Sequence, residues 1–206
     1  MTSPASRRYA GLSGEQRVAL RREALLEAGL ELFAASGKSG ATMTAICAHA
    51  KLTERYFYES FTSRDDLLQQ VLDKIADEVR EAVLAALRTG TGTLEDLVRN
   101  AIASFVAILT DDPRKGRVSL IESAGFEPLR THRRASLRSF AQMVADEATR
   151  MYGDRAWPPE RGEINGLLFV GGLAELVTAW LNDEIAISPD EIVDVATHQF
   201  LSTAHQ

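Results

Sequence analysis

A group of polar and aromatic side chains between Thr42 and Phe61 has the chemistry needed to contact a polyanion. The spacing predicts a short helix after Thr42, a tight turn around Lys51, and a second short helix capped by Thr53. On the second helix, Phe57 and Phe61 stand four residues apart and face a core, which leaves these side chains outward: Glu54, Arg55, Tyr56, Tyr58 and Glu59. Such a helix-turn-helix has the geometry that enters the major groove of DNA.

Further helices must hold this motif in place, and the sequence is helical almost throughout. Ser13, with Gln16 three residues later, fits a capping box, and Gly37 is expected to end the helix that follows. Ser63 is expected to cap a long helix that ends near Arg88. Five more helices are predicted over about 94–109, 114–124, 129–151, 160–182 and 188–203. No alternating run predicts a strand, so the expected fold is all-α with nine helices.

The domain organisation expected from this pattern has three parts. Residues 1–12 show no periodicity and are expected to form a flexible arm. Residues 13–62 are expected to form the helix-turn-helix domain, and residues 63–206 a larger helical domain.

Composition points to a cytoplasmic protein without a membrane partner. The chain has 206 residues, of which 45% are hydrophobic and 25% are charged. No apolar run approaches the roughly 20 residues that a membrane span needs, and no secretory signal is present. The single cysteine, Cys47, excludes an internal disulfide framework.

Charge is distributed unevenly along the chain. Residues 1–64 hold nine Lys and Arg against six acidic residues, whereas the remainder holds 14 against 23. The net charges are therefore +3 and −9, which suits a polyanion partner at one end only. Ordinary solvated helix faces would produce the same difference.

The stretch from about Arg21 to Leu72 resembles the DNA-binding domain of the TetR (tetracycline-repressor-like) regulators. The matching positions follow one another in order and spacing: Ala28 to Phe33, Gly37, Thr42, Ile46, Ala50, Leu52, Thr53, Phe57, Tyr58, Phe61, Ser63, Arg64, Leu67 and Leu68. The remainder is similar in architecture, with residues 171–181 typical of the penultimate helix of that family.

This resemblance implies roles for individual residues. Thr42 or Thr44 would anchor the motif on a phosphate, and Arg64 would contact another. Base edges would be read by Arg55 and Tyr56, and arginine can fork onto O6 and N7 of guanine. The hydroxyl of Tyr58 would meet backbone phosphate.

Three residues depart from the family pattern. Lys51 stands where glycine is usual, so a backbone with positive φ there would cost about 1 kcal/mol, although the amine could reach a phosphate. Glu54 and Glu59 bring negative charge where neutral or basic residues are usual. Each could accept a hydrogen bond from cytosine N4 or weaken DNA binding.

The resemblance also implies a ligand cavity and a dimer interface in the larger domain. A mostly apolar cavity for an apolar or aromatic effector would be lined by Phe105, Leu109, Ile121, Glu122, Phe140, Met143, Val144, Asn165, Phe169 and Trp180. A homodimer interface on the last two helices would include Leu168, Gly171, Gly172, Leu176, Ala179, Ile192, Val195, Ala196, Gln199 and Phe200. An ordinary intrachain core is the alternative interpretation of both sets.

The sequence contains no pattern that indicates redox, metal-binding or catalytic chemistry. Cys47 is expected to be a small core residue rather than a redox switch. The four histidines are too scattered for a metal site, and no pattern indicates a cofactor or an enzyme. The expected function is a ligand-released regulator, most often a repressor in this family, on a palindromic operator. An architectural DNA-binding protein without a ligand and a helical small-molecule carrier are the alternatives.

Overall fold

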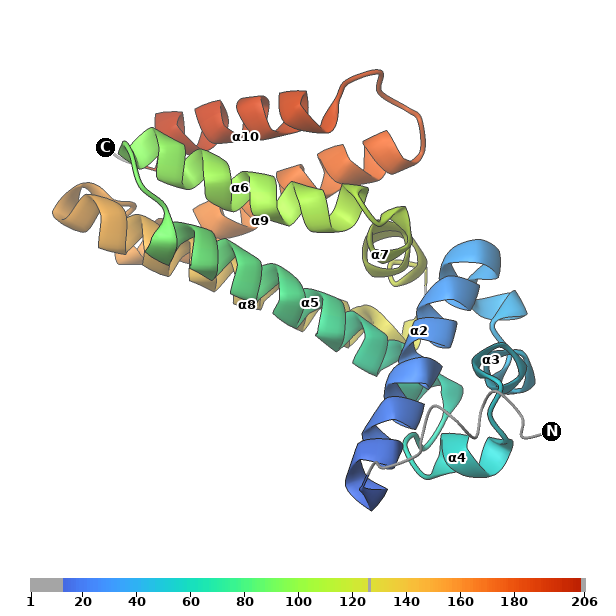
Figure 1. Ribbon diagram of the computed structural model, residues 1–206. Coiled ribbons are helices and arrows are strands. Elements are labelled where there is room, and N and C mark those ends of the chain that lie inside the picture. Colours follow the sequence, from blue (N-terminus) through green and yellow to red (C-terminus); the bar gives the residue numbers. More distant parts are fainter. Residues whose placement is uncertain (1–12, 126, 205–206) are drawn as a thin grey trace. The chain divides into compact units, whose positions relative to one another are not determined.

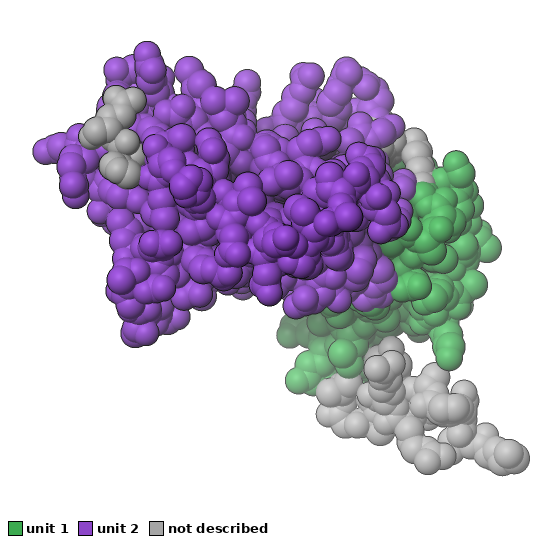
Figure 2. Space-filling model, turned by 90° about the horizontal axis from the view of Figure 1, so that it is seen from above, with its two compact units in different colours: residues 1–71 green, residues 72–206 purple. Residues whose placement is uncertain are grey.

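The chain is all-helical, as Figure 1 shows in a computed structural model that describes residues 13–125 and 127–204. These residues form nine α-helices and no strand, which confirms the predicted fold class. The chain divides into two compact units, residues 1–71 and residues 72–206 (Figure 2). The arm predicted over residues 1–12 lies outside the described residues.

The first unit is built from α2 (Gly14–Gly40), α3 (Met43–Ala50), α4 (Glu54–Tyr58) and the start of α5 (Arg64–Thr89). The predicted capping box is present, because Ser13 Oγ accepts from the Gln16 N–H at 3.1 Å and Gln16 Oε1 accepts from the Ser13 N–H at 2.8 Å. Gly37 has φ 58°, so the backbone leaves the helical conformation where the sequence predicted a stop, and one further turn reaches Gly40.

The core of the first unit joins its four helices. Phe33 of α2, Ile46 of α3 and Phe57 of α4 are fully buried, together with Phe61 and Leu67. Each such side chain contributes about 1.5–3 kcal/mol through removal of apolar surface from water. The outer face of α4 is therefore held on a rigid base.

The second unit contains the rest of α5, α6 (Leu94–Thr110), α7 (Pro113–Gly116), α8 (Arg130–Tyr152), α9 (Pro159–Leu181) and α10 (Pro189–Thr203). α9 packs along α8, and α10 packs along α6 (Figure 1). The α8–α9 contact is close at Gly166, where an added Cβ would lie 2.3 Å from the carbonyl oxygen of Ala141. Thr93 and Ser188 form capping boxes at the starts of α6 and α10.

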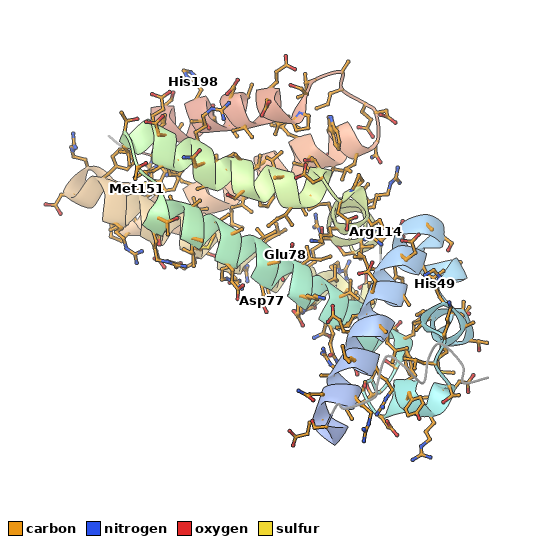
Figure 3. All side chains as sticks on the ribbon, viewed as in Figure 1. His49, Asp77, Glu78, Arg114, Met151 and His198 are labelled. Carbon is orange, nitrogen blue, oxygen red and sulfur yellow. The ribbon has the colours of Figure 1, made fainter. Side chains whose placement is uncertain are left out.

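A polar contact ties α5 to α7 within this unit. Lys115 Nζ lies 2.5 Å from Glu78 Oε1, while Asp77 pairs with Arg80 on α5 itself at 2.9 Å. Figure 3 labels Asp77 and Glu78 on α5 and Arg114 on α7. Neighbouring acids on α5 thus have different partners.

The helix predicted over residues 114–124 differs from expectation. α7 spans only Pro113–Gly116, and a π-helix continues it over Arg117–Glu122. The hydroxyls of Ser119 and Ser123 donate to the carbonyl oxygens of Lys115 and Ser119 at 2.6 and 2.5 Å, and such side-chain bonds to the preceding turn distort helices. π-helical turns are frequent at functional sites.

α9 is the one helix among the described residues with the length and apolar composition of a membrane span, at a mean hydropathy of 1.6. The sequence was expected to hold no apolar run of that length, because Gly171 and Gly172 interrupt the strongest segment. Glycine does not interrupt the helix itself. α9 packs on α8 and α10, so its buried apolar side chains, among them Val170, Leu173 and Val177, belong to the core of the second unit.

Candidate DNA interface and ligand cavity

The first helix of the motif begins and ends as the sequence predicts. Thr42 caps α3, since its Oγ1 accepts from the Ala45 N–H at 3.2 Å. Lys51 ends α3 in the left-handed conformation, with φ 56° and ψ 39°, and its N–H bonds to the carbonyl oxygen of Ala48. The turn thus needs positive φ at a residue that has a Cβ, so the Lys51 backbone is strained.

The second helix of the motif, α4, presents its polar face to solvent. The side chain of Arg55 is 84% exposed, and Tyr58 is 60% exposed, whereas Phe57 between them is fully buried. Thr53 occupies the cap position in an extended conformation without a side-chain capping bond. A short helix with a buried aromatic anchor and exposed hydrogen-bonding groups can be inserted into a groove.

Glu59 connects this face to α2. One carboxylate oxygen lies 3.4 Å from Nε of Arg55, and the other lies 3.4 Å from a guanidinium nitrogen of Arg21. The Arg21 guanidinium also lies 4.3 Å from the centre of the Tyr56 ring, a cation–π contact that leaves Tyr56 half-buried. Glu59 therefore faces two cations of its own chain, a pairing that the sequence did not reveal because Arg21 is distant in sequence.

The remaining predicted DNA-contacting residues surround the motif. Thr44 is exposed, and its hydroxyl lies 3.4 Å from the carboxylate of Glu54. Arg64 opens α5, is half-buried, and lies 3.3 Å from Asp65 Oδ1. Thr42, Lys51 and Thr53 are exposed as well.

Cys47 is buried on the inner face of α3. Burial and, to a smaller extent, the charge of Glu54 raise the pKa of the Cys47 thiol. A thiol of this kind holds little thiolate at neutral pH, and the thiolate is the reactive form. The residue thus has the surroundings of the small core residue expected from the sequence.

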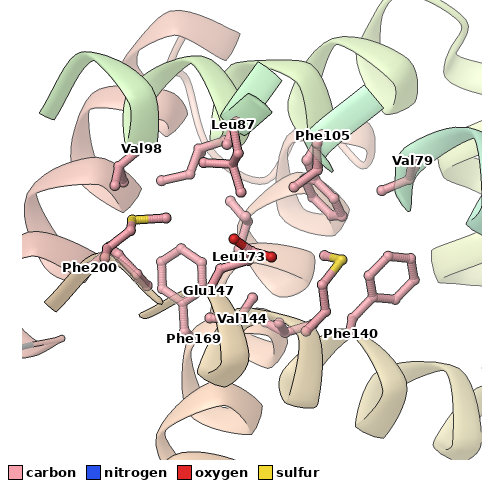
Figure 4. A pocket seen from close by; sticks show the side chains of 16 residues that line it. Val79, Leu87, Val98, Phe105, Phe140, Val144, Glu147, Phe169, Leu173 and Phe200 are labelled. Carbon is pink, nitrogen blue, oxygen red and sulfur yellow. The ribbon is translucent and has the colours of Figure 1, made fainter. Parts of the chain in front are cut away.

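An apolar cavity of about 80 Å³ lies inside the second unit, between α5, α6, α8 and α9 (Figure 4). Five of the predicted cavity residues line it, namely Phe105, Phe140, Met143, Val144 and Phe169. Glu147 is its one ionisable lining residue, and its Oε1 accepts from Arg150 at 2.7 Å. A second cavity of about 90 Å³ is lined by Phe105, Phe140 and also by Leu109.

The other predicted cavity residues lie elsewhere. Asn165 lines a surface groove between α9 and α10, together with Leu168 and Phe169, and lines neither cavity. Ile121, Glu122 and Trp180 are half-buried and line neither cavity. The sequence also missed Val79, Val83 and Leu87, which line the first cavity from α5 at helical spacing.

That surface groove of about 520 Å³ runs between α9 and α10. Its walls include Leu168, which is 70% exposed, and Val195, which is 57% exposed. An added Cβ at Gly171 or Gly172 would meet no atom within 4 Å. Two helices therefore leave a contiguous apolar and glycine-bearing face uncovered within the chain.

The predicted dimer residues fall on two different faces. The groove is lined by Leu168, Gly172, Leu176, Ala179, Val195, Ala196 and Gln199. Ile192 and Phe200 instead lie in the core of the unit, where the Phe200 ring centre is 5.2 Å from that of Phe169. They belong to the buried stripe of α10, with Val193 and Thr197, whereas Val195 and Gln199 are exposed. Ala196 is buried and also lines the groove. Ile164 and Ile185, also on or near the groove, were not anticipated.

Within the part of the chain that the structure describes, no three His, Cys, Asp or Glu side chains are grouped as metal ligands. Of the three described histidines, His49 lies in the first unit on α3, and His132 and His198 lie in the second unit on α8 and α10; Figure 3 labels His49 and His198.

Comparison with known proteins places this geometry in a regulatory context. Residues 25–71, which include the whole motif, match the model of the tetR family of bacterial regulatory proteins. The chain is 27% identical over 181 residues to the HTH-type transcriptional activator FasR of Mycolicibacterium smegmatis, a match that covers 87% of this chain and 80% of FasR.

Solved structures show the same fold. A TetR-family transcriptional regulator from Bordetella parapertussis superposes with a TM-score of 0.65 at 21% identity, covering 88% of this chain and 94% of that one. The fatty acid degradation regulator FadR from Bacillus halodurans gives a TM-score of 0.70 at 15% identity, covering 90% and 97%. At these identities the similarity concerns the fold, and it extends over both units.

Proposed function

Since the chain belongs to the TetR family of bacterial regulatory proteins, we propose that it is a ligand-responsive transcriptional repressor that binds a palindromic operator as a homodimer. The observation that carries the proposal is the outer face of α4, where Arg55 and Tyr58 are exposed on a helix anchored by Phe57. In this account Arg55 and Tyr56 read base edges. Phosphates are held by Thr42, Thr44, Lys51, Thr53, Tyr58 and Arg64.

Dimerisation through the α9–α10 groove supplies the second DNA-reading helix. Exposed Leu168 and Val195, with the open backbone at Gly171 and Gly172, suit the close approach of a second copy. Two motifs related by a two-fold axis would read half-sites one DNA turn apart, about 34 Å. A Leu168→Glu variant should be monomeric by sedimentation and should bind operator DNA much more weakly.

The effector is an apolar molecule that enters the cavities of the second unit. Their walls are mostly aliphatic and aromatic, which favours a ligand that removes apolar surface from water. FadR, which shares the fold, is named as a regulator of fatty acid degradation. Ligand binding would change the population of two states that differ in DNA affinity.

Activation of transcription is a second candidate, because the relative FasR is named an activator. A reporter gene placed behind the operator distinguishes repression from activation. Loss of the protein raises expression if it represses and lowers expression if it activates.

Selection of bound sequences from a random duplex library tests the proposal as a whole. We expect a dyad-symmetric sequence that the wild-type protein protects and that an apolar effector releases. Equal binding to all duplexes, with no effect of any ligand, would indicate an architectural protein. Ligand binding without DNA binding would indicate a carrier. The proposal places the protein in the cytoplasm, where its operator lies.

A further inference from the structure

The two cavities of the second unit adjoin each other. Both are lined by Val79 of α5, Phe105 of α6, Phe140 of α8 and Val170 of α9. These four side chains, two of them aromatic rings, form the partition between the cavities. One ligand could therefore occupy both if the partition moved aside.

The polar groups are gathered at one end of this pair. Besides Glu147, which pairs with Arg150, the first cavity is lined by apolar side chains and Met sulfurs. The second cavity has a polar end formed by Ser119 of the π-helix, by Ser123 directly after that helix, and by His132, Arg133 and Ser136 of α8.

Arg133 is the charged group at this end that has no charged partner. Among the described residues, no carboxylate, carbonyl oxygen or ring contacts its guanidinium, although the side chain is only half-exposed. His132, beside it, has Nε2 at 3.0 Å from Asp73 Oδ1, yet this buried nitrogen has no hydrogen-bond partner among the described residues, so the two groups form an ion pair only when the ring is protonated. Ser119 and Ser123 donate their hydroxyl protons to backbone carbonyls. Arg133 and Ser136, three residues apart on one face of α8, keep free donors.

We propose that the adjoining cavities form one site for an anionic amphiphile, whose alkyl chain lies in the first cavity and whose carboxylate is bound by Arg133 and Ser136. This inference rests on the proposed ligand-responsive function and adds the charge and the orientation of the effector. A guanidinium and a carboxylate form paired, charge-assisted hydrogen bonds, which neutral head groups cannot match. At the opposite end, Glu147 repels an anion, which favours the same orientation of the ligand.

The site must widen when the ligand enters. The cavities measure about 80 and 90 Å³, whereas ligand sites usually measure about 300–1,000 Å³. Movement of Phe105 and Phe140, which are both half-buried, would join the cavities. Phe140 would then leave the Arg80 guanidinium, which lies 5.2 Å from the centre of its ring. Val79 of α5 is one of the four side chains that line both cavities, so a ligand that joins them would displace part of α5. This helix begins in the DNA-binding unit and continues into the second unit.

Calorimetric titration of the full chain with decanoate, decanol, decyl phosphate and decyltrimethylammonium tests the site. Decanoate should bind at least tenfold more tightly than decanol, since a hydrogen bond to a charged group contributes about 1.5–3 kcal/mol. Arg133→Gln should abolish this preference, and Arg133→Lys should retain much of it. Arg134→Gln is the matched control, because Arg134 is exposed and lines neither cavity.

The outcomes separate the two proposals. Equal binding of decanoate and decanol by the wild type, or an unchanged preference in a folded Arg133→Gln variant, overturns the anion site and leaves an apolar effector in place. Tighter binding of decyl phosphate than of decanoate would replace the carboxylate by a phosphate head group, and preferred binding of the ammonium would overturn the site. If none of the four compounds binds, the apolar effector of the proposed function fails as well.

Discussion

The carboxylate of Glu59 lies 3.4 Å from Nε of Arg55, the residue four positions before it, and the side chain of this arginine is 84% exposed. Arg21 meets the same carboxylate from α2. The proposed base-reading arginine is therefore already paired in the free protein. DNA must compete with Glu59 for Arg55, so Glu59 should lower DNA affinity.

Glu59→Gln should raise the affinity for DNA by a few-fold. The exposed pair contributes little to stability, so folding should change by less than about 1 kcal/mol, whereas a negative charge near phosphate is removed. Fluorescence anisotropy with a labelled duplex measures the change. Glu95→Gln, which removes an equal charge from α6 in the other unit, is the control. An unchanged affinity of the Glu59 variant would contradict this account, and a lower affinity would indicate that Glu59 contacts a base.

Arg55→Ala should lower affinity and relax the preference at one base position of each half-site. A bidentate contact to guanine contributes about 1–3 kcal/mol of discrimination. Competition with operators changed at single positions measures this effect. Arg64→Ala is the contrasting variant, because loss of a phosphate contact weakens binding to all sequences about equally. A uniform loss for Arg55→Ala, or a changed preferred sequence for Arg64→Ala, would refute the assigned roles.

Lys51→Gly should stabilise the protein by about 1 kcal/mol, because glycine adopts φ 56° without the Cβ strain that Lys51 carries. Lys51→Ala removes the amine but retains the Cβ, so it should give no such gain. The difference between the two variants therefore measures the backbone strain alone. Urea unfolding measures both variants. If the amine contacts phosphate, both variants should bind DNA more weakly and with a smaller salt dependence. A destabilised Lys51→Gly variant would contradict this account of the turn.

Asp66 links the motif to α5 and should make stability depend on acid pH. Its carboxylate accepts from the N–H and hydroxyl of Thr62 at 2.7 and 2.9 Å, and the backbone bond foremost lowers the pKa of Asp66 below 3.8. Since the folded pKa lies below the unfolded one, the stabilisation is present above about pH 4 and is lost as pH falls through the folded pKa.

The comparison with Asp66→Asn measures this contribution. The variant should be less stable than the wild type at pH 7 by about 1 kcal/mol, as for loss of a helix-capping bond. The difference should shrink below pH 4. A difference that stays constant from pH 7 to pH 3 would show that the carboxylate charge has no part in it.

Local signals in the sequence were sufficient for the helices and their caps. Ser13, Thr42, Thr93 and Ser188 act within three residues of themselves, so their hydrogen bonds could be predicted without tertiary structure. The left-handed backbone at Lys51 followed from comparison with a position where glycine is usual. The spacing of Phe57 and Phe61, four residues apart, was sufficient to predict which face of the motif is buried, because residues at this spacing lie on one side of a helix.

Contacts between distant segments could not be predicted in this way. The approach of Arg21 to Glu59 depends on how α2 crosses α4. The sequence also does not show which apolar residues of α10 face the core of their own chain and which face a second copy. Phe200 was therefore predicted to lie at the dimer interface, although it packs on Phe169. The π-helix after Gly116 depends on hydroxyl bonds that periodicity does not reveal.

The central claim is that the outer face of α4 binds a specific DNA sequence. The most direct test is the affinity of the full chain for its selected duplex and for a scrambled duplex, measured at several salt concentrations. We expect at least a thousandfold preference for the selected duplex, and an affinity that falls steeply with salt as phosphate-bound cations are released. Equal affinity for both duplexes, or binding that does not change with salt, would contradict the account.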